Sequence, residues 1–214
     1  MAEMLGQLIL HPLSSMRLVL RRIKEIPQKG LPRFSSRDEE TFDSRYDVET
    51  SGMVRIVSTA SPNAAHGNRY EACSEEIIRW SIEHCASPAA STVFIDIGCG
   101  KGKAMIIAAE YGFSRIIGIE YSESLAKAAI RNLETSRVES QVLIEDAVAY
   151  RFPPGQSLVF MYNPFDQHVF RQVLRHIPSS ARIAYCGPGQ VTLTDCGWTP
   201  VAKKGAAAIY VRGF

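Results

Sequence analysis

The sequence predicts an α/β protein with a Rossmann-like, doubly wound sheet of seven strands, mostly parallel, that ends in a C-terminal antiparallel hairpin. Short β-rich runs alternate with helical patterns over residues 92–186, which is typical of parallel strands joined by helical crossovers. Two more β-rich runs, 198–203 and 206–212, leave no room for a helix between them and predict the hairpin. A glycine-rich loop follows the first run, as in folds that bind a ligand at the strand ends.

The elements are expected in a regular order. Strands are expected at 92–97, 115–120, 141–145, 157–162 and 181–186, and helices at 102–111 and 123–135. A further helix begins after Asp166, a natural N-cap, because apolar residues then recur at helical spacing. Upstream, a helix is expected to begin near Ser74, whose hydroxyl can cap it, and to end before Pro88.

The first 69 residues are expected to form an N-terminal helix and a lid-like extension, and residues 70–214 the main domain. Over 13–26, apolar residues recur at helical spacing and basic residues occupy another face, so this helix is basic and amphipathic. It is expected to pack on the protein's own domain or on a second copy, which makes a homodimer compatible with the sequence; an anionic membrane or partner surface is the alternative. Residues 37–68 are expected to be irregular, with at most one short helix, and residues 37–75 to cover the site.

The composition is that of an ordinary globular protein, with 214 residues, 46% hydrophobic, 21% charged and a net charge of +2. So small a charge gives no reason to expect nucleic acid as the partner. The five cysteines form no C-x-x-C pair, and the histidines form no ligand-spaced cluster, so no disulfide framework and no metal site are expected. No run of eighteen apolar residues predicts a transmembrane segment, and we expect a cytoplasmic protein.

The stretch 94–103, F-I-D-I-G-C-G-K-G-K, carries the most information about function. Glycines at alternate positions let the backbone turn sharply and approach a ligand at the end of the first strand. Glu120 ends the second strand, where an acid can accept the hydroxyls of a ribose. Nicotinamide dinucleotides and S-adenosylmethionine are both bound in this way, but Lys103 replaces the last glycine of the dinucleotide motif. The loop therefore favours S-adenosylmethionine.

Over about residues 70–214, the chain resembles class I S-adenosylmethionine-dependent methyltransferases. Asp96 and the glycines are similar to their first motif, Glu120 to the ribose acid, 145–147 to the adenine-side segment, and 163–165 to the motif after the fourth strand. More narrowly, I-G-I-E-Y-S and the Y-N-P-F motif at 162–165 resemble small bacterial methyltransferase-domain proteins. A fainter similarity extends to lysine methyltransferases with the same sheet.

The resemblance implies S-adenosyl-L-methionine as the cofactor and assigns its binding residues. These are Tyr70, Asp96, Gly98, Cys99, Gly100, Glu120, Tyr121, Asp146, Ala147 and Asn163. Asp96 is expected to orient the ammonium, Glu120 the ribose diol and Asp146 the adenine amino group, while Tyr121 and Val148 cover the ring. The alternatives are a helix cap for Asp146 and ordinary polar strand ends for Asp96 and Glu120. Cys99 is expected to be a packing residue rather than a nucleophile.

The catalytic residues implied by the resemblance are Asn163, Pro164 and Tyr162. In amino methyltransferases a D/N-P-P-Y/F motif receives both hydrogens of an acceptor NH2 group; here Phe165 replaces the second proline and Asp166 the aromatic residue. The partial match favours an amine or amide nitrogen acceptor. The alternative is that Asn163 and Pro164 only end the strand and open the next helix.

The identity of the methyl acceptor is open at this stage. A small molecule or a protein side chain is expected rather than nucleic acid, because the surface charge is balanced. The competing function is a noncatalytic module that binds the nucleoside cofactor and acts through partner contacts, and a nicotinamide-dependent reductase is disfavoured by Lys103.

Overall fold

The computed structural model describes residues 42–54, 63–85, 87–187 and 193–213. All of them belong to one compact unit, Glu40–Phe214. The basic helix expected at 13–26 lies outside the described residues.

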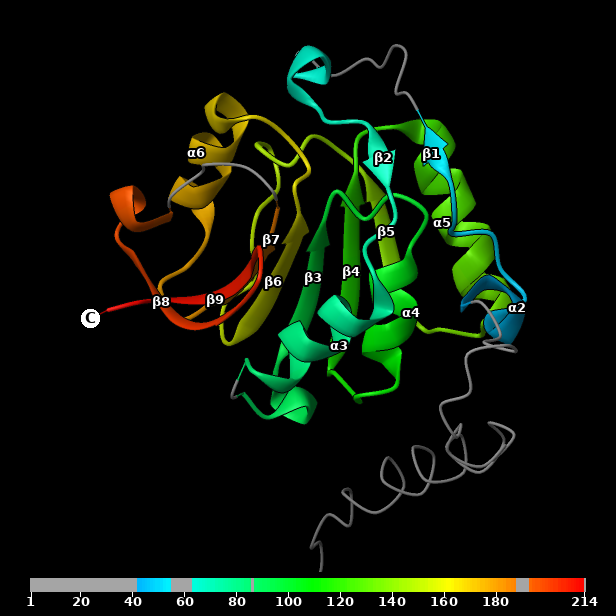
Figure 1. Cartoon of the computed structure of the whole chain (residues 1–214), viewed down its shortest axis with the longest axis horizontal. Coiled ribbons are helices and arrows are strands. Elements are labelled where there is room, and N and C mark those ends of the chain that lie inside the picture. Colours follow the sequence, from blue (N-terminus) through cyan, green and yellow to red (C-terminus); the bar gives the residue numbers. More distant parts are fainter. Residues whose placement is uncertain (1–41, 55–62, 86, 188–192, 214) are drawn as a thin grey trace, which may run out of the picture. The chain divides into compact units, whose positions relative to one another are not determined.

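A seven-stranded sheet forms the centre of this unit (Figure 1). Its strands are β3 (Val93–Ile97), β4 (Arg115–Glu120), β5 (Gln141–Ile144), β6 (Ser157–Tyr162), β7 (Arg182–Cys186), β8 (Trp198–Lys204) and β9 (Ala207–Arg212). Their spatial order is β5-β4-β3-β6-β7-β9-β8. The first five run parallel, while β9 pairs antiparallel with both β7 and β8. The predicted fold, including the terminal hairpin, is confirmed.

Four α-helices connect or flank the strands. They are α3 (Glu75–Glu83), α4 (Lys103–Ala109), α5 (Glu123–Thr135) and α6 (Gln167–His176). Both predicted N-caps are confirmed: the Ser74 hydroxyl accepts from the Ile77 amide, and one Asp166 carboxylate oxygen accepts from the amides of His168 and Val169. Two 3-10 turns, η2 (Ala89–Ser91) and η3 (Leu193–Cys196), complete the main connections.

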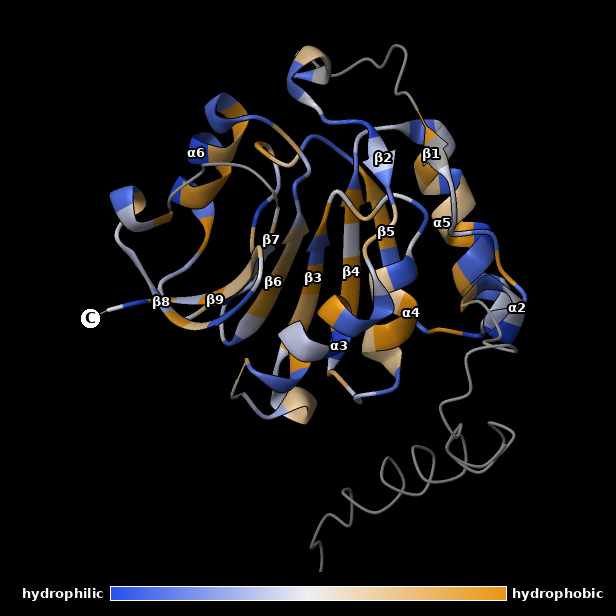
Figure 2. Ribbon diagram, in the orientation of Figure 1, coloured by the Kyte–Doolittle hydropathy of each residue, from blue (hydrophilic) through white to orange (hydrophobic). Residues whose placement is uncertain are grey.

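Two apolar layers cover the sheet, one on each face. Alternate strand residues point to opposite faces, so Phe94 packs in the layer beneath α3, α4 and α5, whereas Ile95 packs in the layer beneath α6. Figure 2 shows the hydrophobic residues concentrated in the central strands and in α4. Because β3 lies between β4 and β6 and is covered on both faces, its carboxyl end occupies the middle of the sheet edge.

Described residues upstream of α3 line the cavity edge of the sheet, where the parallel strands end. We call residues 42–54 and 63–73 the cover segment. It contains α2 (Phe42–Tyr46), β1 (Met53–Val54), η1 (Ala64–His66) and β2 (Tyr70–Glu71). β1 and β2 pair antiparallel, a ladder that the sequence did not predict because strands of two residues have no readable periodicity.

Replacing Asp166 tests the cap of α6. Asp166→Ala removes the acceptor of two first-turn amides and is expected to lower the free energy of unfolding by about 0.5–2 kcal/mol. Asp166→Asn keeps an acceptor oxygen and is the matched control, with a smaller loss expected. Urea denaturation measures both; equal losses in the two variants would contradict the capping role.

Candidate functional site

A cavity of about 490 Å³ lies at the carboxyl ends of β3, β4 and β6. This volume is in the range of small-ligand sites. Its walls come from three sources: the strand ends with their loops, the start of α4, and the cover segment. The residues that line it include Asn63, Gly67, Asn68, Tyr70, Glu71, Cys73, Asp96, Gly98, Cys99, Lys103, Glu120, Tyr121, Asp146, Ala147, Tyr162, Asn163 and Pro164.

The cavity brings together nearly all of the residues that the sequence assigned to a cofactor or acceptor. Gly100 is the exception among them, because it is buried behind the ring of Tyr70 and does not line the cavity. Val148, expected to cover the adenine ring, does not line it either, although Tyr121 and Ala147 do. One cavity therefore spans the ends of neighbouring strands, as parallel α/β sheets require of their ligand sites.

The glycines of the loop are needed where neighbouring groups approach closely. At Gly98, which has φ +75°, a Cβ atom would lie 2.7 Å from the Cβ of Pro164. At Gly100, with φ +54°, it would lie 2.2 Å from Cε2 of Tyr70. Both positions combine a left-handed backbone with contact distances that no side chain tolerates. The loop thus packs directly against the Asn163-Pro164 turn on one side and against the cover segment on the other.

Asp96 presents a buried carboxylate to the cavity. Asp96 is only 3% exposed, and its carboxylate has no hydrogen-bond partner among the described residues. Burial, together with the nearby Glu120 carboxylate, raises the pKa of Asp96 from its ordinary value of 3.8 to about 8. Such a group favours a cationic ligand, because a positive charge nearby stabilises the ionised carboxylate.

Glu120 is held in place by backbone amides. The Gly100 amide donates to one carboxylate oxygen at 3.0 Å, and the Ser122 amide donates to the other at 2.9 Å. Burial nevertheless raises the pKa of Glu120. A carboxylate has about four acceptor positions, so the two amides leave capacity for ligand hydroxyls. The glycine loop and the acid of the second strand therefore form one rigid unit.

Asp146 and Tyr121 define the far end of the cavity. One Asp146 oxygen accepts from the Val148 amide at 2.9 Å and the other from Nδ2 of Asn63 at 2.9 Å. The residues that follow Asp146 form a turn, so the helix-cap alternative does not apply to it. The Tyr121 hydroxyl is buried without a hydrogen-bond partner among the described residues.

The turn after β6 forms another part of the cavity wall. Asn163 has φ +42°, a left-handed conformation that asparagine tolerates better than most residues. Its carbonyl accepts from Nδ2 of Asn68 at 2.9 Å, and the Pro164 carbonyl accepts from the Asn68 backbone amide at 3.0 Å. The Asn163 side chain has no hydrogen bond to the described residues. Tyr162 lies beside it, and burial raises the pKa of its hydroxyl, with the neighbouring Cys73 and Glu71 adding to the shift.

Sequence reasoning missed several residues of the cover segment that line the cavity. Asn63, Gly67, Asn68 and Cys73 had no motif to mark them, because their roles depend on partners far away along the chain, such as Asp146 for Asn63 and Asn163 for Asn68. The close packing at Gly67 is visible only in the structure: a Cβ there would lie 2.0 Å from the Tyr121 hydroxyl oxygen. Asn68 connects the cover segment to the Asn163-Pro164 turn.

Two expected exclusions concern cysteine and metal chemistry. Cys99 is buried, and burial raises the pKa of its thiol well above the ordinary value, which suits a packing residue. Among the described residues, no three His, Cys, Asp or Glu side chains gather closely enough to hold a metal ion.

In the same part of the chain, no helix has the length and apolar character needed to cross a membrane.

Residues 94–184 match the family model of a methyltransferase domain. The matched stretch runs from β3 to β7 and contains Asp96, Glu120 and Asn163. The match therefore indicates a methyltransferase domain over this stretch, which is less than half of the chain. The search of curated proteins gave no significant match.

Solved structures share the fold. Magnesium protoporphyrin IX methyltransferase from Synechocystis PCC 6803, with bound S-adenosylmethionine, is 17% identical; the match covers 65% of this chain and 77% of that one, with a TM-score of 0.50. A protein from Pyrococcus horikoshii OT3 is 15% identical over 65% of this chain and 89% of its own, with a TM-score of 0.55. At these identities the similarity establishes the architecture only.

The raised pKa of Asp96 predicts a pH-dependent stability. Between its ordinary pKa and about 8, the folded protein binds a proton here that the unfolded chain releases, so this group's contribution to the free energy of unfolding falls as pH rises. Relative to the wild type, Asp96→Asn is therefore expected to gain stability from about pH 5 to about pH 8, by at most about 1.4 kcal/mol per pH unit.

Urea denaturation of the unliganded protein across this pH range measures the effect. Glu134→Gln, which neutralises an exposed carboxylate on α5, is the matched control and should show no such trend. A difference between Asp96→Asn and wild type that is independent of pH would contradict the raised pKa.

Proposed function

We propose that this protein is an S-adenosylmethionine-dependent methyltransferase that transfers the methyl group to an amine or amide nitrogen. The observation that carries the proposal is the layout of the cavity. Buried acids at the ends of β3 and β4 and the Asn163-Pro164 turn after β6 all line it. The family match over 94–184 supports the same reaction class.

The chain's own groups suit each part of the methyl donor. Asp96 would pair with the ammonium of the methionine moiety, the Gly98 backbone would lie against that moiety, and Glu120 would accept the ribose hydroxyls. Asp146 and the Ala147 amide would meet the adenine edge, with Tyr121 against the ring. Burial, with the Glu120 charge adding to it, raises the pKa of Asp96, and a cationic ligand would stabilise the ionised carboxylate.

The transfer itself requires alignment rather than a nucleophilic side chain. As the acceptor nitrogen forms a bond to the methyl carbon, the carbon–sulfur bond breaks and its electron pair stays on sulfur. The acceptor nitrogen then loses a proton to solvent. Holding the two reactants in line and excluding water supplies much of the rate in such a displacement.

The turn after β6 supports nitrogen as the acceptor atom. The Asn163 side-chain oxygen has no partner among the described residues and is an acceptor for one N–H of the substrate. The Pro164 carbonyl accepts from Asn68, and its second lone pair remains for another N–H. Tyr162 keeps its proton, since burial raises the pKa of its hydroxyl, so it would orient the acceptor rather than act as a base.

Cofactor binding is tested at Glu120. By isothermal calorimetry, the wild type should bind S-adenosylmethionine and its demethylated product, with weak or absent binding of NAD. Glu120→Gln is expected to weaken binding of both nucleosides by about tenfold or more, because it removes a charge-assisted acceptor. Glu134→Gln on the exposed face of α5 is the control. A preference for NAD would exclude the proposal.

Acceptor chemistry is tested at Asn163. Asn163→Ala should keep cofactor affinity near that of the wild type and lower methyl transfer by about a hundredfold, because it removes a group that aligns the acceptor. The assay incorporates labelled methyl groups into a cell lysate, which is then fractionated into protein, RNA and small molecules.

Alkaline treatment distinguishes methyl esters from base-stable methylation in the same assay. Label on nitrogen survives it, whereas label in methyl esters is released as methanol. Undiminished transfer by Asn163→Ala, or label held only in base-labile esters, would contradict the nitrogen assignment. Cofactor binding without any transfer would favour a noncatalytic binding module.

A further inference from the structure

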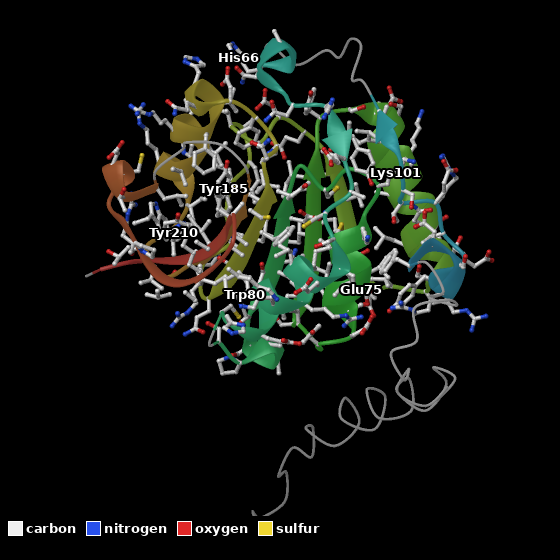
Figure 3. The ribbon with its side chains drawn as sticks, in the orientation of Figure 1. His66, Glu75, Trp80, Lys101, Tyr185 and Tyr210 are labelled. Atoms are coloured by element: carbon white, nitrogen blue, oxygen red, sulfur yellow. The ribbon has the colours of Figure 1, made fainter. Side chains whose placement is uncertain are left out.

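Lys101 lies in the middle of the glycine loop but does not line the cavity. Its side chain is 10% exposed, which is unusual for lysine. The ammonium donates to the carbonyl of Ser51 at 2.8 Å and lies 3.3 Å from a carboxylate oxygen of Glu49. Figure 3 labels this side chain next to the cover segment. The cofactor loop is thus attached to a part of the chain fifty residues upstream.

The Ser51 carbonyl is the main partner of the Lys101 ammonium. The Glu49 side chain is 89% exposed, and an ion pair so open to solvent contributes little. By contrast, the backbone at Ser51 is fixed by Asp43, whose two carboxylate oxygens accept from the amides of Thr50 and Ser51, each at 2.9 Å. An ammonium group loses its hydration when it is buried, and this is costly unless a hydrogen-bond acceptor is held in place for it. The fixed Ser51 carbonyl is such an acceptor. The ring of Tyr70, 5.7 Å from the ammonium, adds a cation–π contact.

A second anchor ties the same two segments together from α5. Asn132 is buried, and its Nδ2 donates to the Lys101 carbonyl at 2.9 Å and to the Glu49 carbonyl at 3.1 Å. Its oxygen accepts from the Glu49 amide at 3.2 Å. One asparagine therefore bonds both the glycine loop and the cover segment. Because Asn132 holds the glycine loop and the cover segment together, the Ser51 carbonyl lies within reach of the Lys101 side chain.

The connection extends to the cavity wall through Tyr70. The Tyr70 hydroxyl donates to the Thr50 carbonyl at 2.5 Å, immediately before Ser51. The ring of Tyr70 packs on Gly100 and lines the cavity. The position of residues 49–51 therefore determines where this ring stands over the site. A substitution of Lys101 would therefore act on the cavity through the backbone of residues 49–51, which do not line it.

We propose that Lys101 is a positioning residue for cofactor binding: by holding the Ser51 carbonyl, it fixes the cover segment against the glycine loop and thereby sets Tyr70 over the cavity. This rests on the proposed function, since the ligand concerned is S-adenosylmethionine. It also implies that the cofactor and the order of residues 49–54 are coupled reciprocally: the ligand stabilises the cover segment, and the ordered cover segment strengthens ligand binding.

The test compares Lys101→Met with wild type in the full chain. Calorimetry with S-adenosylhomocysteine should show affinity reduced by about tenfold to a hundredfold, because a buried charge-assisted hydrogen bond is lost. Hydrogen exchange should show faster exchange at the amides of 49–54 in the unliganded variant. Adding ligand should slow exchange there in the wild type and much less in the variant. Lys127→Met, at an exposed lysine of α5, is the matched control and should change neither measurement.

Lys101→Arg separates this role from a general structural one. It keeps a cationic donor for the Ser51 carbonyl, so it should bind the ligand more tightly than Lys101→Met and restore exchange protection at 49–54. The proposal is overturned if Lys101→Met retains wild-type affinity, or if its 49–54 amides are protected as in the wild type. If the wild-type protein itself fails to bind the nucleoside, the proposed function fails, and the exchange rates of the unliganded proteins still decide whether Lys101 holds the cover segment.

Discussion

The close approach of backbone to its neighbours at the glycine loop is the constraint on which the rest of the site depends. Gly98 contacts Pro164, and Gly100 contacts the ring of Tyr70, each at a distance that leaves no room for a Cβ atom. Within β4, a Cβ at Gly118 would lie 2.5 Å from the sulfur of Met105 and 2.8 Å from that of Cys99. The absence of side chains thus lets β3, β4, the turn after β6 and the cover segment converge on one cavity.

The same convergence explains why the site is electrostatically unfavourable without a ligand. Asp96 and Glu120 end adjacent parallel strands, so their carboxylates lie close together away from water. Two amides satisfy Glu120, whereas Asp96 has no partner among the described residues. Ionising Asp96 beside Glu120 is therefore unfavourable in the unliganded protein, and perturbed acids of this kind are typical of functional sites.

The cover segment contributes in two separate places. At one end, residues 49–51 are bonded to Lys101 and Asn132, beside the glycine loop. At the other, Asn68 bonds both carbonyls of the Asn163-Pro164 turn, where we propose that the acceptor binds. A single upstream segment is therefore in contact with both halves of the proposed reaction. Through this segment, packing around the glycine loop could affect the geometry of the Asn163-Pro164 turn.

The sequence by itself determined the strands of the sheet, their alternation with helices along the chain, and the caps at Ser74 and Asp166. It also determined the acids and glycines at the strand ends. These follow from local patterns: periodicity, capping residues and a loop that only glycine can form. Only the tertiary structure decided the roles of Asn63, Asn68, Lys101 and Asn132, because each one acts through partners between 31 and 95 residues away along the chain. Polar side chains of this kind carry no periodic signal, and which carbonyl or carboxylate they meet is set by packing. The boundary expected at residue 69 stays a prediction for the same reason: it depends on contacts, which local patterns do not encode.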